Sequence, residues 1–130
     1  MARQVGQLLV GLVGLFDAGA GAALLLAPEW FYANFGDFPP FNRHYAGDAG
    51  AFLLPIGIGL IVASIRPRGL GPIVALGLAA SWLHAVNHLY DALYHAGHGR
   101  ASIADAGLVV GMAFALTVGV VLGRSSKATD

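Results

Sequence analysis

The chain has 130 residues, of which 57% are apolar and only 11% are charged, and its mean hydropathy is +0.71. A soluble domain carries roughly a quarter charged residues, so this chain lacks the polar surface that a water-soluble fold needs. Its seven basic and seven acidic residues cancel, which excludes a basic nucleic-acid binder. The lack of cysteine excludes disulfide frameworks, thiolate metal sites and cysteine nucleophiles. The composition indicates a small integral membrane protein with no nucleic-acid partner.

Four stretches are long and apolar enough to cross a bilayer as helices, which takes about 20 residues each. Apolar residues fill consecutive positions in them instead of alternating, so none is predicted to be a strand. We predict an all-α fold, an integral membrane four-helix bundle that forms one domain over residues 1–130. A cleaved signal peptide is disfavoured because Asp17 interrupts the first stretch. The predicted spans cover residues 7–27, 45–65, 70–94 and 102–122.

The orientation follows from the positive charges, which mark the cytoplasmic side of a membrane protein. Four spans put both termini on the same side of the membrane. That side holds most of the basic residues, and we therefore predict cytoplasmic termini in a multi-pass protein of the cell inner (plasma) membrane. The basic residues on that side are Arg3, Arg66, Arg68, Arg124 and Lys127, against Arg43 and Arg100 on the other.

The outer loop after the first span is rich in aromatic residues. Aromatic rings favour the headgroup level of a bilayer, so we predict a short interfacial helix from Glu29 to Phe35. It would act as a membrane anchor or as a lid over a site that opens outward. The aromatic residues are Trp30, Phe31, Tyr32, Phe35, Phe38, Phe41 and Tyr45.

Every charge within the predicted spans is an aspartate, and histidine is the only embedded group that could neutralise it. The third span places its polar residues three or four positions apart, which puts them on one helix face. In hydrocarbon such a face should turn toward the bundle interior. The aspartates are Asp17, Asp48, Asp91 and Asp105, and the third-span face carries Ser81, His84, His88, Asp91 and His95, flanked by Asn87 and Tyr94.

The depth of these residues adds to the pattern, because a helix rises about 1.5 Å per residue. Asp48, Asp91 and Asp105 lie about one helical turn from the outer end of their spans, while Asp17 and His84 fall near mid-membrane. The inner half is almost wholly apolar. The polar residues are therefore expected to converge in the outer half of the bundle.

Three interpretations of this cluster stay open. In the first, His84, His88 and Asp91 hold a metal ion, with Asp17, Asp48 or Asp105 completing the shell. Mixed histidine and carboxylate ligation suits zinc, iron, manganese or copper. A haem is less favoured, because it would need two imidazoles across a gap. In the second interpretation the cluster binds a small polar or cationic ligand from outside and exchanges protons with it.

The third interpretation is a non-enzymatic accessory or scaffold subunit, in which the cluster is a structural polar network. The leading hypothesis is a site for a metal ion or small polar ligand that serves a membrane redox or transport process. No catalytic residue is predicted. Membrane lipid is an expected partner, together with a larger membrane complex or a second copy of the chain. His44, Asn87 and His95 are second-tier site candidates.

Glycines in the fourth predicted span form two G-x-x-x-G patterns, Gly107–Gly111 and Gly119–Gly123. Such patterns let helices approach closely. We expect both to serve packing within the bundle, although this span could also form a dimer face.

Two short motifs carry a family resemblance. The second span opens with Asn42-Arg43-His44-Tyr45-Ala46-Gly47-Asp48, and the third contains His84-Ala85-Val86-Asn87-His88. With four short spans and an aromatic outer loop, the chain resembles small bacterial DoxX-like membrane proteins, in particular their uncharacterised four-helix members. Some DoxX-related proteins are membrane subunits of quinone-linked sulfur oxidoreductases. Because this chain has no cysteine, that activity is assigned to none of its residues.

Overall fold

The computed structural model of the chain describes residues 1–35, 40–66, 68, 70–94 and 103–125, and every regular element among them is a helix. The prediction of an all-α fold is confirmed for these residues, which contain no strand. The helices are α1 (Ala2–Leu26), α2 (Pro28–Asn34), α3 (Arg43–Ile65), α4 (Gly71–Tyr94) and α5 (Ile103–Ser125).

The four predicted spans correspond to α1, α3, α4 and α5, each of which is long and apolar enough to cross a membrane. In the most apolar 18-residue stretch of each of these helices, no more than 28% of the residues are buried inside the bundle. Most of their apolar side chains therefore face outward, where only lipid can cover them without cost. These are the features of a multi-pass membrane protein.

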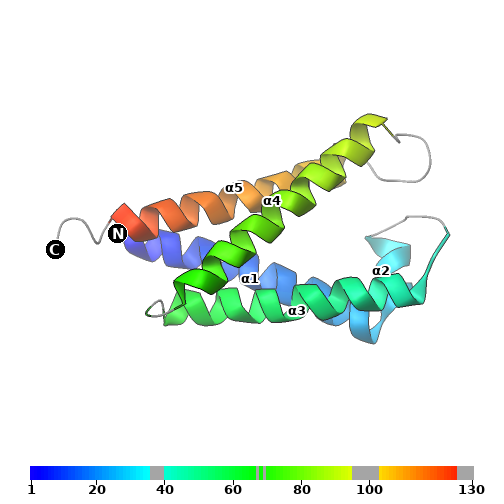
Figure 1. The fold of residues 1–130 in the computed structure, drawn as a ribbon, viewed down its shortest axis with the longest axis horizontal. Helices are drawn as coiled ribbons and strands as arrows, with labels where there is room; N and C mark the ends of the chain where they lie inside the picture. Colours follow the sequence, from blue (N-terminus) through cyan, green and yellow to red (C-terminus); the bar gives the residue numbers. More distant parts are fainter. Residues whose placement is uncertain (36–39, 67, 69, 95–102, 126–130) are drawn as a thin grey trace.

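Successive long helices run in opposite directions, so that α1 begins and α5 ends at the same end of the molecule (Figure 1). We call this the N-terminal end, and the opposite end, where α2 lies, the α2 end. Helix α1 lies against α3 and α5, and α4 also lies against α3 and α5. Among the described residues, α1 and α4 have no Cα atoms within 8 Å of each other, and neither do α3 and α5. The long helices thus form a ring of four.

Glycines bring α1 and α3 into backbone contact between Gly14 and Gly21 of α1. A Cβ atom added to Gly14 would lie 2.8 Å from the Gly57 carbonyl oxygen, and one added to Gly50 would lie 2.7 Å from the Gly21 carbonyl oxygen. Gly14 and Gly21 are seven residues apart, as are Gly50 and Gly57. A spacing of seven keeps residues on one helix face, so each helix presents a flat glycine surface to the other.

The core lies toward the N-terminal end and is small. It is made of Val10, Val13, Leu60 and Leu116, which come from α1, α3 and α5 and are between 0 and 7% exposed. Partly buried side chains of α4, among them Val74, pack against it. This end of the bundle is therefore closed by apolar contacts among all four long helices.

The Gly119–Gly123 pattern packs within the bundle, as predicted, whereas the prediction is wrong for Gly107–Gly111. A Cβ atom on Gly6 would lie 2.6 Å from the Gly119 carbonyl oxygen, so Gly119 brings α5 against α1. A Cβ atom on Gly107 or Gly111 would meet no atom within 4 Å. Those two glycines lie on the part of α5 that faces away from its neighbours, so they take no part in internal packing.

A side-chain contact joins α4 to α5 near the middle of both helices. The Trp82 indole N–H donates to the Thr117 hydroxyl at 3.1 Å, and that hydroxyl donates to the Ala113 carbonyl at 2.8 Å. The Trp82 ring also meets the Phe114 ring edge-on, with centroids 5.0 Å apart. In an apolar surrounding the indole N–H has few other acceptors, so this contact fixes α4 against α5.

We expect Thr117→Val to lower the free energy of unfolding by about 0.6 kcal/mol, and at most about 1.7 kcal/mol, the range for interhelical hydrogen bonds in membranes. Valine has a similar volume but offers no acceptor to Trp82. Thr117→Ser keeps the hydroxyl and should unfold like the parent protein. Unfolding in mixed micelles, followed by Trp82 fluorescence in a Trp30→Phe background, measures the difference. Equal stability of the valine and serine variants would contradict the assignment.

Candidate functional site

The polar residues of α4 extend the face by which that helix packs on α3. Near the N-terminal end, this face carries Ile73, whose methyl group lies 2.6 Å from a Cβ built on Gly59, and Gly77, which lies against Leu60. His84 follows Gly77 after seven residues, His88 after four more and Asp91 after three more. These spacings keep the side chains on one helix face. We call His84, His88 and Asp91 the polar stripe.

The polar stripe lies where α3 no longer covers α4. His84 is exposed, while His88 and Asp91 are half-buried. The imidazole rings of His84 and His88 meet edge-on, with centroids 4.6 Å apart and planes at 67°. The Asn87 amide donates to a carboxylate oxygen of Asp91 at 3.4 Å. The two imidazoles of the stripe are thus near enough to act on one small ligand.

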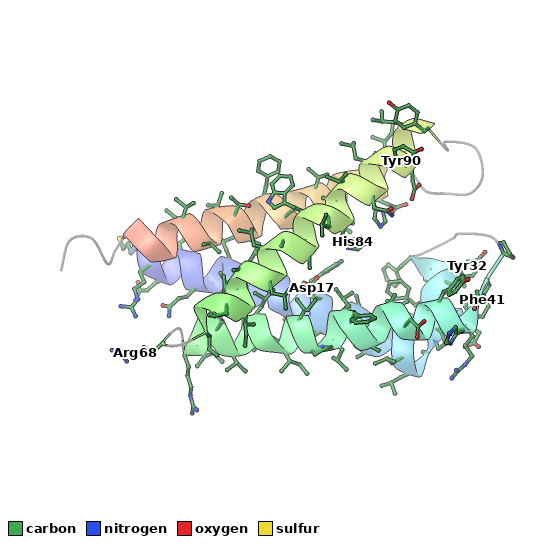
Figure 2. The ribbon with its side chains drawn as sticks, viewed as in Figure 1. Asp17, Tyr32, Phe41, Arg68, His84 and Tyr90 are labelled. Carbon is green, nitrogen blue, oxygen red and sulfur yellow. The ribbon has the colours of Figure 1, made fainter. Side chains whose placement is uncertain are left out.

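Asp17 lies on the face of α1 that forms the core. Val10 and Val13 belong to this face, and Asp17 follows Val13 by four residues toward the α2 end. Its carboxylate is half-buried, and among the described residues none donates a hydrogen bond to it. Figure 2 shows Asp17 on α1 and His84 on α4, both near the middle of the bundle's long axis. Their common depth in the membrane stays a prediction.

Asp105 occupies a similar position on α5. Gly119 packs against α1, and Met112, seven residues earlier, packs on the core. Asp105 precedes Met112 by another seven residues, so it lies on the α1-facing side of α5 at the α2 end. Its side chain is half-buried. Asp17 and Asp105 therefore both extend core-forming faces beyond the core.

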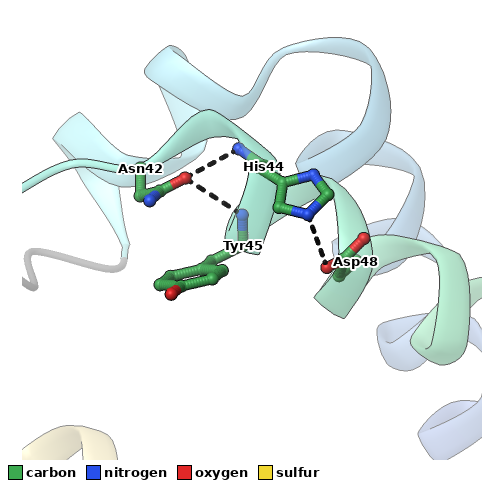
Figure 3. A network of polar contacts seen from close by, with 4 residues as sticks. All are labelled: Asn42, His44, Tyr45 and Asp48. Carbon is green, nitrogen blue, oxygen red and sulfur yellow. Dashed lines mark hydrogen bonds and ion pairs between the residues drawn. The ribbon is translucent and has the colours of Figure 1, made fainter.

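Asp48 belongs to a separate contact at the start of α3. Its carboxylate lies 3.5 Å from Nε2 of His44, and the two side chains are 59% and 80% exposed (Figure 3). The Asn42 side chain caps this helix by accepting from the backbone N–H groups of His44 and Tyr45, which fixes where α3 begins. The structure brings His44 and Asp48 to each other, and not to the polar stripe.

No three His, Asp or Glu side chains in the described part of the chain lie close enough together to hold a metal ion. His95, a predicted member of the α4 face, lies outside the described residues, as do Arg100 and Phe38. Metal binding by His84, His88 and Asp91 therefore stays a prediction. Two imidazoles one turn apart can supply two ligands of a metal shell, and the others would have to come from elsewhere.

The residues that hold the site in place were not predicted from the sequence. Trp82 and Thr117 fix α4 against α5, and Gly77 sets the side of α4 that faces Leu60. Thr117 did carry a signal, since it is the single hydroxyl within the apolar run from Leu108 to Gly123. A lone hydroxyl in such a run marks a contact with another helix.

Comparison with known proteins identifies no relative. No family model matches the chain, no curated protein is similar to it, and no solved structure matches it. The resemblance to DoxX-like proteins therefore stays a prediction, and the function has to be argued from the site.

Proposed function

We propose that the protein binds a small cation or a cationic polar molecule at the α2 half of the bundle, in a membrane redox or transport process. The observation that carries this proposal is the position of the polar stripe. His84, His88 and Asp91 occupy the α3-packing face of α4 beyond the point where α3 covers it. Polar side chains within a membrane span are costly, so a face that carries several of them indicates a binding site.

The sign of the charges supports a cation. Asp17, Asp91 and Asp105 are half-buried and lie on α1, α4 and α5, respectively. Asp17 lies near the middle of α1, whereas the described arginines lie at the ends of the long helices or in the turn between α3 and α4. A bound positive charge would be attracted to such a carboxylate in a medium of low dielectric constant, whereas an anion would be repelled.

A divalent metal ion is the simplest ligand of this class, and zinc, iron, manganese and copper all accept imidazole and carboxylate ligands. The ring contact between His84 and His88 provides two adjacent nitrogen ligands, with Asp91 one turn further along the helix. Because these side chains lie on a single helix, such a metal would keep open coordination positions for water or substrate.

Binding of Zn²⁺ to the purified protein in lipid nanodiscs, measured by calorimetry, tests the proposal. We expect the combined substitution His84→Ala and His88→Ala to weaken binding at least tenfold, because it removes both nitrogen ligands. His44→Ala is the matched control, since it removes an exposed histidine of the α2 end that pairs with Asp48. Equal affinity of the parent protein and the double variant would contradict a site on the polar stripe.

We also propose that α2 lies at the headgroup level of the outer leaflet, with both termini in the cytoplasm of a bacterial inner membrane. Helix α2 contacts the ends of the spans α1 and α3. Its aromatic rings cluster, with the Phe35 ring 5.4 Å from Trp30 and 5.5 Å from Phe31, and the Tyr32 ring is 5.1 Å from Phe41. Trp30 and Phe35 remain largely exposed, as suits rings that contact lipid headgroups.

The two tryptophans allow the depth of α2 to be measured. Trp82→Phe leaves Trp30 as the only tryptophan, and Trp30→Phe leaves Trp82. We expect Trp30 to be quenched most by lipids that carry a nitroxide near the headgroup. Trp82, in the middle of α4, should be quenched most by a nitroxide deep in the acyl chains. If Trp30 shows no preference for the shallow quencher, α2 does not lie in the interface.

A further inference from the structure

The four long helices divide into two pairs, α1 with α3 and α4 with α5, and α5 also packs on α1 toward the N-terminal end. In the α1–α3 pair, a Cβ atom on Gly11 would lie 2.9 Å from the Ser64 hydroxyl near one end, and one on Gly21 would lie 2.8 Å from the Leu54 Cα toward the other. A side-chain contact at one end of the interface and a backbone contact toward the other leave the two helices little freedom to tilt against each other.

The α4–α5 pair is joined in another way. The Trp82–Thr117 hydrogen bond connects the two helices in the middle. Ala85 and Ala106, which lie nearer the α2 end, are only 1% and 4% exposed. This pair therefore stays closed from its centre toward the α2 end.

Contacts between the two pairs are concentrated at the N-terminal end. They include Gly6 with Gly119 and Leu60 with Gly77, together with the core around Leu116. At the other end, α2 has no Cα atom within 8 Å of the described residues of α4 or α5. Figure 1 shows α4 and α5 parting from α2 and α3 toward the α2 end. Two stiff units are thus joined at one end only.

We propose that the α4–α5 pair swings toward the α1–α3 pair about the core at the N-terminal end, and that this movement completes the binding site. In the arrangement described here the site is open, with the polar stripe on one unit and Asp17 on the other. Closure brings His84, His88 and Asp91 toward Asp17, so that one small cation can contact both units. Rotation of stiff units about a packed end is a common form of domain closure.

This proposal rests on the proposed function only for the identity of the site, because the movement follows from the distribution of contacts. Spin labels can report it, since the natural chain has no cysteine to compete for labelling. One labelled pair, Tyr45→Cys with Tyr94→Cys, spans the α2 ends of α3 and α4. A second pair, Ile65→Cys with Leu76→Cys, spans the same two helices at the N-terminal end. All four side chains are between 62 and 72% exposed, so labels should not disturb the packing.

We expect the labels at the α2 end, measured in nanodiscs without added metal, to show two populations of distances. The labels at the N-terminal end should show one. Adding Zn²⁺ should enrich the shorter distance at the α2 end and leave the N-terminal pair unchanged. A single distance at the α2 end, as narrow as at the N-terminal end and unaffected by Zn²⁺, would overturn the closure.

The two proposals fail in different ways in this experiment. One outcome is that calorimetry shows Zn²⁺ binding at the polar stripe while the distances at the α2 end form one unchanging population. In that case the binding site is confirmed and the proposed closure is wrong. If two distances are present but Zn²⁺ neither binds nor shifts them, the movement exists and Zn²⁺ binding at the site is wrong.

Discussion

Replacing Gly57 by alanine is expected to separate α1 from α3 and to destabilise the protein more than any other single methyl group. The added Cβ atom would lie 2.7 Å from the Gly14 carbonyl oxygen and 2.8 Å from the Ala18 Cα. Both neighbours are backbone atoms of α1, which cannot rotate away as a side chain can. Forcing extra atoms into a well-packed interface costs about 1–3 kcal/mol, and we expect Gly57→Ala to reach the upper end of this range.

Gly47 provides the matched control on the same helix. A Cβ atom there would meet nothing within 4 Å. Because alanine favours helices over glycine, Gly47→Ala should leave the free energy of unfolding unchanged or raise it by up to about 1 kcal/mol. Unfolding of both variants in mixed micelles, followed by circular dichroism, compares them directly. If Gly57→Ala proves as stable as Gly47→Ala, the α1–α3 interface is not as described.

Asp17→Leu is expected to stabilise the fold while weakening ligand binding. Asp17 is half-buried on the core face of α1, and among the described residues it receives no hydrogen bond. An aspartate at the centre of a membrane helix costs about 2.5–3.5 kcal/mol relative to lipid-compatible residues. Half-burial at a site open to the α2 end reduces that cost, so we expect a gain of about 2 kcal/mol. A carboxylate kept at such a cost is expected to serve binding.

If the polar cluster is only a structural network, the change in the free energy of unfolding should have the opposite sign. If Asp17 holds the helices together through a polar network, Asp17→Leu should lower the free energy of unfolding. The same measurement on Asp48→Leu serves as a control, because Asp48 is exposed at the end of α3 and contacts His44. We expect the control to change neither stability nor Zn²⁺ affinity. Reduced stability of Asp17→Leu would favour an accessory or scaffold protein.

Much of the fold could be predicted because hydropathy alone determines which segments suit a bilayer. The main difference is at the first span, predicted from Gln7, whereas α1 starts at Ala2. Arg3 and Gln4 are helical but too polar to appear in an apolar stretch. Hydropathy cannot show which helix packs on which, and that choice depends on how the glycines of α1 and α3 face each other.

The site was predictable to the extent that it lies on one helix. The polar stripe of α4 follows from spacing alone, since residues three and four apart share a face. Convergence between helices requires their rotation, which sequence does not reveal. Gly50 and Gly57 turn one side of α3 toward α1, and Asp48, two residues before Gly50, lies about 200° around the helix from it. Asp48 therefore pairs with His44 and stays apart from the other aspartates.

The most direct test of a cation site that opens toward the α2 end is the reactivity of single cysteines along one face of α4. We would measure labelling of Asp91→Cys, His88→Cys, His84→Cys and Gly77→Cys by a charged, membrane-impermeant thiol reagent added to one side of oriented vesicles. We expect reaction at the first three positions from the outer side only, and none at Gly77, which packs on Leu60. Failure of His84→Cys and His88→Cys to react from either side, or equal reaction at Gly77→Cys, would contradict it.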